Sequence, residues 1–564
     1  MFLPTTRQEM DALGWEAPDV ILITGDTYID SPYMGVAVIG KYLLTHGFTV
    51  AIIAQPITDS GKDITRLGLP RLFWGVTAGA VDSMVANTTA TGKYRRQDDY
   101  TPGGINVRPN RASIVYTNLI RRWCRPIRPI VLGGIEASLR RFAHYDHTDR
   151  RVRRSLLFDT KADVLAYGMA EKSVAALATA FRDGTDWRRI AGTCVIGHDV
   201  PDGYEKLPDY ETVATDTAAF MAASRQMARL GDDTTCGCAQ RHGDRFVIHH
   251  PASSPMIPAE LDAVYEMDFE HDVHPFYRTG KVRALDTIRQ SITSHRGCFG
   301  QCRFCAITVH QGSRIVSRSP ESILREATRM ARKPGFNGII YDVGGPTANM
   351  YGVTCRRNWV CRDRHCLMPR ICPNLVFGHR VQVDVLKRLM AIPGIRSVFI
   401  ASGIRHDMVM ADGADSVRYV EQLVRHHVSG QLKLAPEHSE PDVLNIMNKP
   451  PVDSLLAFKA LFERTCARMK TRYFLTYYLM VAHPGCTPQH MRELNRFLVN
   501  RLHVTPEQIQ VFTPTPGTLS TAMYHAGTDL DGRTIFCERS PEGKDRQKRM
   551  IRQPGSSGKR RMGR

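Results

Sequence analysis

The sequence predicts an α/β protein in which an N-terminal doubly wound parallel sheet precedes a partial barrel of six β/α steps. Short apolar strands alternate with helical patterns over residues 1–190, and the same alternation restarts at Lys281 and continues to residue 527. The strands are continuous apolar runs. This combination is typical of parallel sheets that helices cover on both faces.

Residues 1–190 form the first predicted domain. The segment Asp19–Asp26 is expected to be a buried strand, Gly35–Gly47 a helix closed by glycine, and Phe48–Gln55 the next strand. Three more strands are predicted in RLFWGVTAG, PIVLGG and ADVLAYG. Because ligands of such sheets bind at the carboxyl ends of the strands, GDTYIDSPYMG and GGIEAS are candidate ligand loops.

Residues 191–280 are predicted to be a connector that packs on its neighbours, and residues 528–564 a C-terminal extension. Between them, residues 281–527 contain the barrel strands RQSITS, GIIYDVGG, RSVFIAS, QLKLAP, TRYFLTYYLMV and QIQVFTP. Six steps are fewer than a closed barrel needs, so an open barrel is expected. In its first helix, Ser319 is the expected N-cap and Pro320 the first helical residue.

The composition indicates a folded, cytoplasmic protein. The chain has 564 residues, of which 43% are hydrophobic and 23% charged, as in ordinary globular proteins. The N-terminus has no apolar run, and no segment reaches roughly 18 consecutive apolar residues, so neither a secretory signal nor a membrane span is predicted. In a reducing compartment, the 14 cysteines are better interpreted as metal ligands or redox groups than as disulfides.

The positive charge is concentrated in a few segments. The net charge is +19, and residues 541–564 hold nine Lys/Arg against two acids. Their Pro, Gly and Ser content predicts a disordered basic tail. This tail and the basic stretch Ser138–Leu157 could contact RNA. Because no RNA-binding motif accompanies the charge, a solvated tail and a charged helix face are the favoured interpretation.

Three cysteines lie close together in SHRGCFGQCRFCAI, namely Cys298, Cys302 and Cys305. Structural zinc normally takes four protein ligands, and here the nearest further candidate is His310. Iron–sulfur clusters are held by closely spaced cysteine thiolates. A cluster of four irons bound by three cysteines leaves one iron open for a substrate or cofactor, so this chemistry fits the pattern better than zinc.

The loop resembles the cluster-binding loop of radical S-adenosylmethionine (radical SAM) enzymes, which carries an aromatic residue where this chain has Phe304. Further segments resemble the methylthiotransferase-like branch of that superfamily: SRSPESILRE, VGGPTANM, LAPEHSEPDVLNIMNKP, VAHPGCT and VFTPTPGTLSTAMY. With GGIEASLRRFAHYD in the N-terminal domain, the whole chain resembles the YgiQ-type radical SAM family. The resemblance names no substrate and no catalytic residue.

The resemblance implies a [4Fe–4S] cluster, S-adenosylmethionine and an external one-electron donor of the flavodoxin or ferredoxin type. Reduction would cleave S-adenosylmethionine to methionine and a 5′-deoxyadenosyl radical, which removes a hydrogen atom from the substrate. Gly344 and Gly345 would let the backbone approach the methionine end of this cofactor. Pro346 stands where relatives often have an acid, and Asp342 is a weak substitute. A tight turn is the alternative role of the glycines.

Two further features concern additional cofactors. The insertion CRRNWVCRDRHCLMPRIC, residues 355–372, holds Cys355, Cys361, Cys366 and Cys372, which indicate either a second metal centre (an iron–sulfur cluster or zinc) or free thiols. The N-terminal domain resembles the cobalamin-binding fold.

In the cobalamin-type loop element, Asp30 and Gly35 keep the expected spacing, but Pro32 replaces the cobalt-binding histidine. Cobalamin is therefore not favoured but stays open, beside a substrate-binding or scaffolding role for the domain.

The leading hypothesis from the sequence is a radical SAM enzyme. Two alternatives from other classes stay open: an iron–sulfur or zinc protein that binds without turnover, and an RNA-binding protein with a structural cluster.

Overall fold

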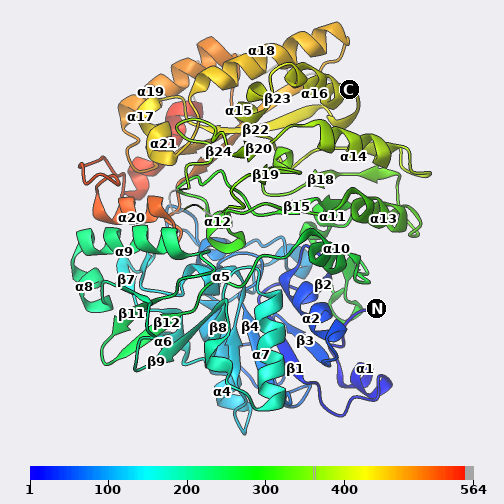
Figure 1. The fold of residues 1–564 in the computed structure, drawn as a ribbon, viewed down its shortest axis with the longest axis vertical. Coiled ribbons are helices and arrows are strands. Elements are labelled where there is room, and N and C mark those ends of the chain that lie inside the picture. Colours follow the sequence, from blue (N-terminus) through cyan, green and yellow to red (C-terminus); the bar gives the residue numbers. More distant parts are fainter. Residues whose placement is uncertain (360, 362–363, 553–564) are drawn as a thin grey trace.

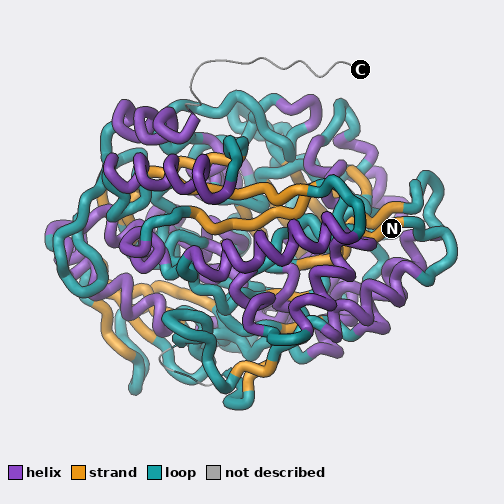
Figure 2. The backbone as a smooth tube through the Cα atoms, turned by 90° about the horizontal axis from the view of Figure 1, so that it is seen from above, coloured by secondary structure: helices purple, strands orange, loops and turns teal. Residues whose placement is uncertain are grey.

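The N-terminal and C-terminal halves of the chain form two α/β layers that lie against each other (Figure 1). The computed structural model describes residues 1–359, 361 and 364–552. The N-terminal sheet occupies the lower part of the view and the barrel the upper part. Viewed from above, helices flank the strands (Figure 2).

Five parallel strands form one side of the N-terminal sheet, in the order β8-β5-β4-β1-β3, with β3 at the edge. They are Val164–Ala166 (β8), Ile130–Leu132 (β5), Phe73–Thr77 (β4), Val20–Thr24 (β1) and Val50–Ala54 (β3). Nearly every residue of these strands is buried, because side chains on both faces meet helices.

The two faces of the sheet are covered by different helices. Val20 and Leu22 of β1 pack in one hydrophobic cluster with α2 (Gly35–Thr45) and α7 (Glu171–Asp183). The alternating residues Ile21 and Ile23 pack with α4 (Ala112–Trp123) on the other face. This arrangement confirms the doubly wound sheet that the continuous apolar strands predicted.

The segment predicted as a connector contributes further strands to this sheet. Thr193–Gly197 (β9) pairs antiparallel with β8 and with Arg245–His249 (β12), and the edge is completed by Cys238–His242 (β11) and Glu205–Leu207 (β10). The sheet thus has nine strands among the described residues. The segment DRFVIHH, which contains β12, could be recognised as a strand from its sequence, but the pairing of β12 with β9 could not, because these strands lie far apart along the chain.

The barrel strands follow one another in chain order. Ser291–Thr293 (β14) pairs with Asp342–Gly344 (β18), and Ile339–Ile340 (β17) with Ser397–Val398 (β21), all parallel. A parallel bridge between Ile404 and Leu434 leads to the sheet of Gln431–Glu437 (β22), Phe474–Val481 (β23) and Gln508–Val511 (β24). The partial barrel of six steps is confirmed.

Among the described residues, five helices cover the barrel strands, and the first of them begins where the sequence predicted. They are Pro320–Ala331 (α13), Arg380–Met390 (α14), Asp415–Gln422 (α16), Val452–Arg468 (α18) and Pro488–Phe497 (α19). Ser319 caps α13 by accepting a hydrogen bond from the Ser322 N–H, and Pro320 is its first residue, as predicted.

The first half of the predicted disordered tail is a helix. Residues Pro541–Arg552 form a helix (α21), and the rest of the tail lies outside the described residues. Lys544, Gln547 and Ile551 are buried at helical spacing. The Gln547 side chain accepts from the Ala482 N–H at 3.0 Å and donates to the Cys486 carbonyl at 3.2 Å. These buried partners stabilise a helix whose composition alone favours disorder.

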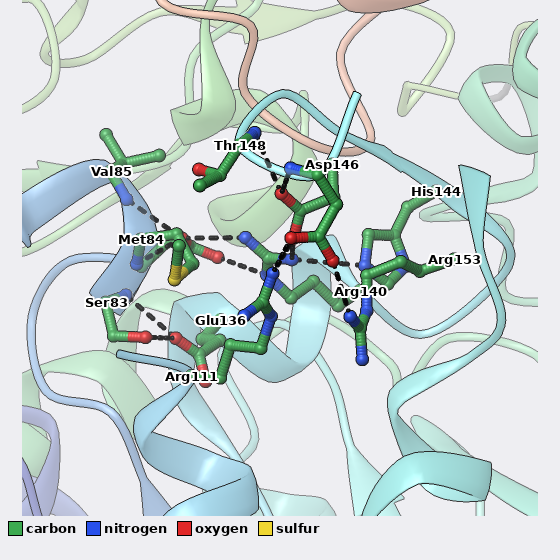
Figure 3. Close-up of polar contacts among 12 residues, drawn as sticks. Ser83, Met84, Val85, Arg111, Glu136, Arg140, His144, Asp146, Thr148 and Arg153 are labelled. Carbon is green, nitrogen blue, oxygen red and sulfur yellow. Dashed lines mark hydrogen bonds and ion pairs between the residues drawn. The ribbon is translucent and has the colours of Figure 1, made fainter. Parts of the chain in front are cut away.

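A buried ion network fixes the segment between β5 and β8 of the N-terminal sheet (Figure 3). Arg140, only 3% exposed, follows the helix Gly134–Leu139 (α5). Its Nε and Nη2 donate to the two carboxylate oxygens of Asp82 at 2.6 and 3.0 Å, and its Nη1 to Asp146 at 3.2 Å. Burial opposes ionisation of Asp82, but the Arg140 guanidinium outweighs it and lowers the pKa of this carboxyl.

Replacing Arg140 by Ala should destabilise the N-terminal domain by about 3–5 kcal/mol, because it leaves buried carboxylates without their partner. Urea unfolding followed by the fluorescence of the buried Trp74 would measure the change. The exposed Arg189, changed to Ala, is the control, with an expected effect within about 0.5 kcal/mol. Equal midpoints for the two variants would refute a stabilising role of the network.

Candidate functional site

The cysteine loop lies between the strand His295–Arg296 (β15) and the helix Ala306–Gln311 (α12). Cys298, Cys302 and Cys305 are half-buried, and none forms a disulfide. The Cys298 N–H donates to the Gly312 carbonyl at 3.2 Å, and the Cys305 N–H to the Cys302 carbonyl at 3.0 Å. The loop is therefore closed on itself and presents three free thiols.

Hydrogen bonds from the far side of the barrel hold the loop in place. The Arg303 N–H donates to the Met447 carbonyl at 3.0 Å, and the Arg303 carbonyl accepts from the Ser520 N–H at 2.9 Å. The Asn448 side chain donates to the Gln301 carbonyl at 3.0 Å. Contacts from the end of α17 (Pro441–Met447) and from α20 (Leu519–Ala526) thus hold the loop in place.

The thiols of the loop influence one another. Burial, followed by the neighbouring charges of Cys302 and Cys298, raises the pKa of Cys305 to about 12. Burial and Cys302 also raise the pKa of Cys298, while the nearby Arg405 guanidinium acts in the opposite direction. Cysteine binds a metal as the thiolate, and the raised pKa values make the thiolates unfavourable. The positive charge of a bound metal centre would have to compensate the free energy of deprotonating these thiols.

Three cysteines in one loop suit an iron–sulfur cluster better than a structural zinc ion, which takes four protein ligands. Among residues 1–359, 361 and 364–552, no group of three or more His, Cys, Asp or Glu side chains is placed to hold one metal ion. A tetrahedral ion with bonds of about 2.3 Å draws its sulfurs to one point. In an iron–sulfur cluster each cysteine binds a different iron, so the sulfurs stay further apart.

A cavity of about 390 Å³ lies between the N-terminal sheet and the barrel. It is lined by residues on both sides of the cysteine loop in the sequence: His295 and Arg296 before it, Ile307 and His310 after it. The N-terminal sheet contributes the carboxyl ends of its strands, including Thr24, Thr77 and Gly133. Both halves of the protein thus meet at one cavity beside the cysteine loop.

Gly344, Gly345 and Pro346 line this cavity directly after β18. A Cβ at Gly344 would collide with the Ser402 side chain, and one at Gly345 with the His295 ring. Close packing therefore requires glycine at both positions. The two strands β14 and β18 hold this segment in place, since the Ser294 N–H donates to the Gly344 carbonyl at 2.7 Å.

Asp342 also lines the cavity, but its carboxylate is engaged within the protein. One oxygen accepts from the backbone N–H groups of Ala401 and Ser402 at 2.7 and 3.0 Å, and the other from the Ser402 hydroxyl. Burial raises the pKa of Asp342. This carboxylate joins β18 to the residues after β21, which leaves it poorly suited to bind a cofactor ammonium group.

Phe304 lies away from the cavity lining. Its ring packs against the barrel core and meets the edge of His483, with ring centroids 6.0 Å apart. A packing role beside the cysteine loop accounts for this residue.

Sequence reasoning missed a polar group in the cavity wall formed by Glu171, Arg296 and His310. Arg296 Nη1 donates to Glu171 Oε1 at 2.6 Å, while Glu171 Oε2 has no hydrogen-bond partner among the described residues. His310 Nδ1 lies 2.9 Å from the Ser138 hydroxyl, and burial lowers the pKa of His310 to about 4. The sequence did contain one indication of this group. Glu171 lies shortly after the carboxyl end of β8, the end of a parallel strand where ligands bind.

The loop that resembles a cobalamin-binding element reaches the same cavity. Pro32 and Gly35 line it, whereas Asp30 is buried and forms an ion pair of 2.8 Å with Lys41. From Pro32 and Gly35 the cavity extends into the N-terminal domain, between the sheet and the helices α2 and α7. This extension is lined by apolar residues and a glycine: Leu22, Phe73, Gly75, Val131 and Val174.

The cysteine-rich insertion places its four thiols near one another. Burial, and then the charges of Cys372, Cys355 and Cys361, raise the pKa of Cys366 to about 11. Among the described residues these cysteines form no disulfide.

Comparison with known families agrees with this geometry. A family model described as "Radical SAM N-terminal" matches residues 2–291, and the model of the radical SAM superfamily matches residues 292–498. The chain belongs to the radical SAM superfamily. The resemblance in the cysteine loop and the barrel motifs is thereby confirmed, and the cofactors of this enzyme class are a [4Fe–4S] cluster and S-adenosylmethionine.

Within the superfamily, the chain is a member of the UPF0313 family. It is 47% identical to UPF0313 proteins of Fusobacterium nucleatum, over 558 residues, and of Thermotoga maritima, over 560 residues, with 98% of each chain covered. A UPF0313 protein of Geobacter sulfurreducens is 45% identical over 97% of this chain and 91% of its own.

Solved radical SAM enzymes share the fold. The methyltransferase TsrM from Kitasatospora setae, with cobalamin and a [4Fe–4S] cluster bound, has a TM-score of 0.52 at 15% identity, covering 95% of this chain and 91% of that chain. The cobalamin-dependent enzyme OxsB, with aqua-cobalamin bound, has a TM-score of 0.50 at 11% identity, covering 90% and 55%. At these identities the likeness concerns the fold alone.

Radical SAM enzymes need a reductant, so a one-electron donor is a partner of this chain. In the part of the chain that the structure describes, no helix is long and apolar enough to cross a membrane.

Proposed function

We propose that Cys298, Cys302 and Cys305 hold the [4Fe–4S] cluster of this radical SAM enzyme and that the adjoining cavity is its reaction chamber. The observation that carries the proposal is that residues on both sides of the cysteine loop line the same cavity as Gly344 and Gly345. The cavity therefore gives a cofactor bound at the loop direct access to a ligand held by the N-terminal domain.

When bound, the cluster supplies one electron for the cleavage of S-adenosylmethionine to methionine and the 5′-deoxyadenosyl radical. The chain's contribution is to bind and orient. Gly344 and Gly345 bring backbone polar groups close to the methionine end of S-adenosylmethionine. Because the Asp342 carboxylate is already engaged, we propose that backbone groups rather than this side chain bind the ammonium group.

The polar group of the cavity wall suggests what the substrate presents. The carboxylate of Glu171 is 2% exposed and has one oxygen without a partner among the described residues, so a ligand with a hydrogen-bond donor would satisfy it. His310, whose pKa is about 4, is neutral at physiological pH and can accept or donate through Nε2. We propose that these side chains orient the substrate.

The function is tested by anaerobic incubation of the reduced protein with S-adenosylmethionine. Release of 5′-deoxyadenosine, measured by mass spectrometry, is the expected result. Protein that contains a reduced [4Fe–4S] cluster and binds S-adenosylmethionine, yet releases none in the presence of cell extract as a substrate source, would contradict the proposal.

A second candidate function is cobalamin-dependent radical chemistry. The observation that favours it is the apolar extension of the cavity between the N-terminal sheet and α2, which could hold a flat group such as the nucleotide base of cobalamin. Two solved enzymes of this fold hold cobalamin. Since Pro32 stands at the cavity where a cobalt-binding histidine would lie, cobalt would have no ligand from this position.

Filling the apolar extension should abolish cobalamin binding. In Gly75→Val, the added side chain would point at Leu22 and into the extension, so the visible absorption of cobalamin retained after gel filtration should fall by at least tenfold. Gly378→Val, outside the cavity, is the control and should leave it unchanged. If the unmodified protein retains no cobalamin, this candidate function is wrong.

The finer details of partners and location belong to the same proposal. We propose a flavodoxin or ferredoxin as the one-electron donor and a reducing compartment, the cytoplasm, as the location. RNA contact through the basic tail concerns residues 541–564, of which residues 553–564 lie outside the described residues. Loss of RNA affinity on removal of these residues would support such a contact.

A further inference from the structure

We propose that Cys355, Cys361, Cys366 and Cys372 bind a second iron–sulfur cluster, held by four thiolates, next to the cysteine loop. Four thiolates leave no open iron, so this cluster would not bind S-adenosylmethionine. The proposal draws on the proposed function only for the first cluster, and the experiment below separates the two.

The backbone of the insertion brings the cysteines together. Two short antiparallel strands, Thr354–Cys355 (β19) and Leu375–Val376 (β20), close its base. Inside it, the Cys372 N–H donates to the Cys366 carbonyl at 2.8 Å. The first, third and fourth cysteines therefore lie on a closed loop.

Polar groups around the thiols suit a cluster of negative charge. The Asn374 side chain donates to Cys372 Sγ at 3.8 Å, and hydrogen bonds to the sulfurs tune such clusters. Arg364 lies between two of the cysteines in the sequence, and its Nε donates to the Cys361 carbonyl at 3.4 Å. An ion pair with Asp232 of the N-terminal half holds the Arg364 guanidinium in position. A fixed positive charge thus accompanies four thiolates.

The surroundings are apolar and shared with the cysteine loop. A small hydrophobic cluster built on Phe299, Met350 and Leu367 contacts Cys355, Cys366 and Cys372 and also Cys298. The ring of Trp359, from the insertion, lies over Phe299 with centroids 5.7 Å apart. Burial of this kind shields a cluster from water, and it joins the insertion to the loop that holds the first cluster.

A cluster fits these observations better than zinc. The intervals of the four cysteines match no common zinc or iron–sulfur spacing, so they do not decide between the metals. The surroundings do: the insertion packs against the loop proposed to hold the first cluster, and the Asn374 side chain donates to a cysteine sulfur. We therefore expect iron rather than zinc.

Iron and sulfide counts on anaerobically reconstituted full-length protein test the proposal. We expect about eight irons per chain, two clusters of four. The double variant Cys361→Ala, Cys366→Ala should fall to about four, whereas the control Cys236→Ala, Cys238→Ala, which touches neither site, should stay at about eight.

A triple variant, in which Cys298, Cys302 and Cys305 are all changed to Ala, leaves the insertion unaltered. It tests the second cluster even if the double variant misfolds. It should retain about four irons with the Mössbauer signature of a closed [4Fe–4S] cluster. A triple variant without iron, or zinc in place of iron in the insertion, would overturn the second cluster. Iron that is unchanged in the triple variant would instead overturn the proposed role of the cysteine loop.

Discussion

Replacing Cys302 by Ala is expected to abolish the release of 5′-deoxyadenosine, to less than a thousandth of the original rate. Two remaining thiolates cannot hold three irons of the cluster, so the reduced site that cleaves S-adenosylmethionine is lost. The same result is expected for Cys298→Ala and Cys305→Ala. Mass spectrometry would measure the loss of product, and a decrease in the visible iron–sulfur absorption would measure the loss of this cluster.

Cys236→Ala is the control for this prediction. Cys236 is also a free, half-buried cysteine, but it lies before β11 in the N-terminal sheet. Its removal should leave product formation within twofold of the original. Cofactor cleavage that survives Cys302→Ala would contradict the assignment of the loop.

Gly345→Val is expected to weaken the binding of S-adenosylmethionine by more than tenfold, which corresponds to about 1.4 kcal/mol. The new side chain would collide with the His295 ring, while the hydrogen bond between the Ser294 N–H and the Gly344 carbonyl holds the backbone nearby. Iron content should not change, because no cluster ligand is touched. Equilibrium dialysis with labelled S-adenosylmethionine would measure the affinity.

The collision itself can be tested by a second substitution. In the double variant Gly345→Val, His295→Ala, the obstructing ring is absent, and part of the lost affinity should return. Unchanged affinity in Gly345→Val would show that this glycine does not border the cofactor.

The sequence was sufficient for features that depend on local pattern. The helix Pro320–Ala331 begins at the predicted cap Ser319, because a serine followed by a proline and an amphipathic run is a local signal. The six barrel strands could be recognised for the same reason. The helix Pro541–Arg552 could not, since its buried Gln547 is stabilised by Ala482 and Cys486, which lie far away in the sequence.

In the candidate site, too, some residues could be predicted from the local sequence and others only from the fold. The three cysteines lie within one short loop, so their spacing in the sequence alone indicates a cluster-binding site. By contrast, Glu171 and Arg296 belong to different halves of the chain and lie far apart in the sequence. Their contact at the cavity follows from the fold, so the sequence alone could not predict it. The engagement of Asp342 by Ser402 likewise depends on the neighbouring strand, so the sequence alone left its role open.

The central claim is that the cysteine loop holds a cluster with one iron open to S-adenosylmethionine. It is tested most directly by the electron paramagnetic resonance spectrum of the dithionite-reduced protein, recorded with and without this cofactor. To isolate the loop, the spectra should be taken on the Cys361→Ala, Cys366→Ala variant. We expect one reduced cluster whose signal shifts when S-adenosylmethionine is added. An identical signal in both samples, at a cofactor concentration that saturates binding, would contradict it.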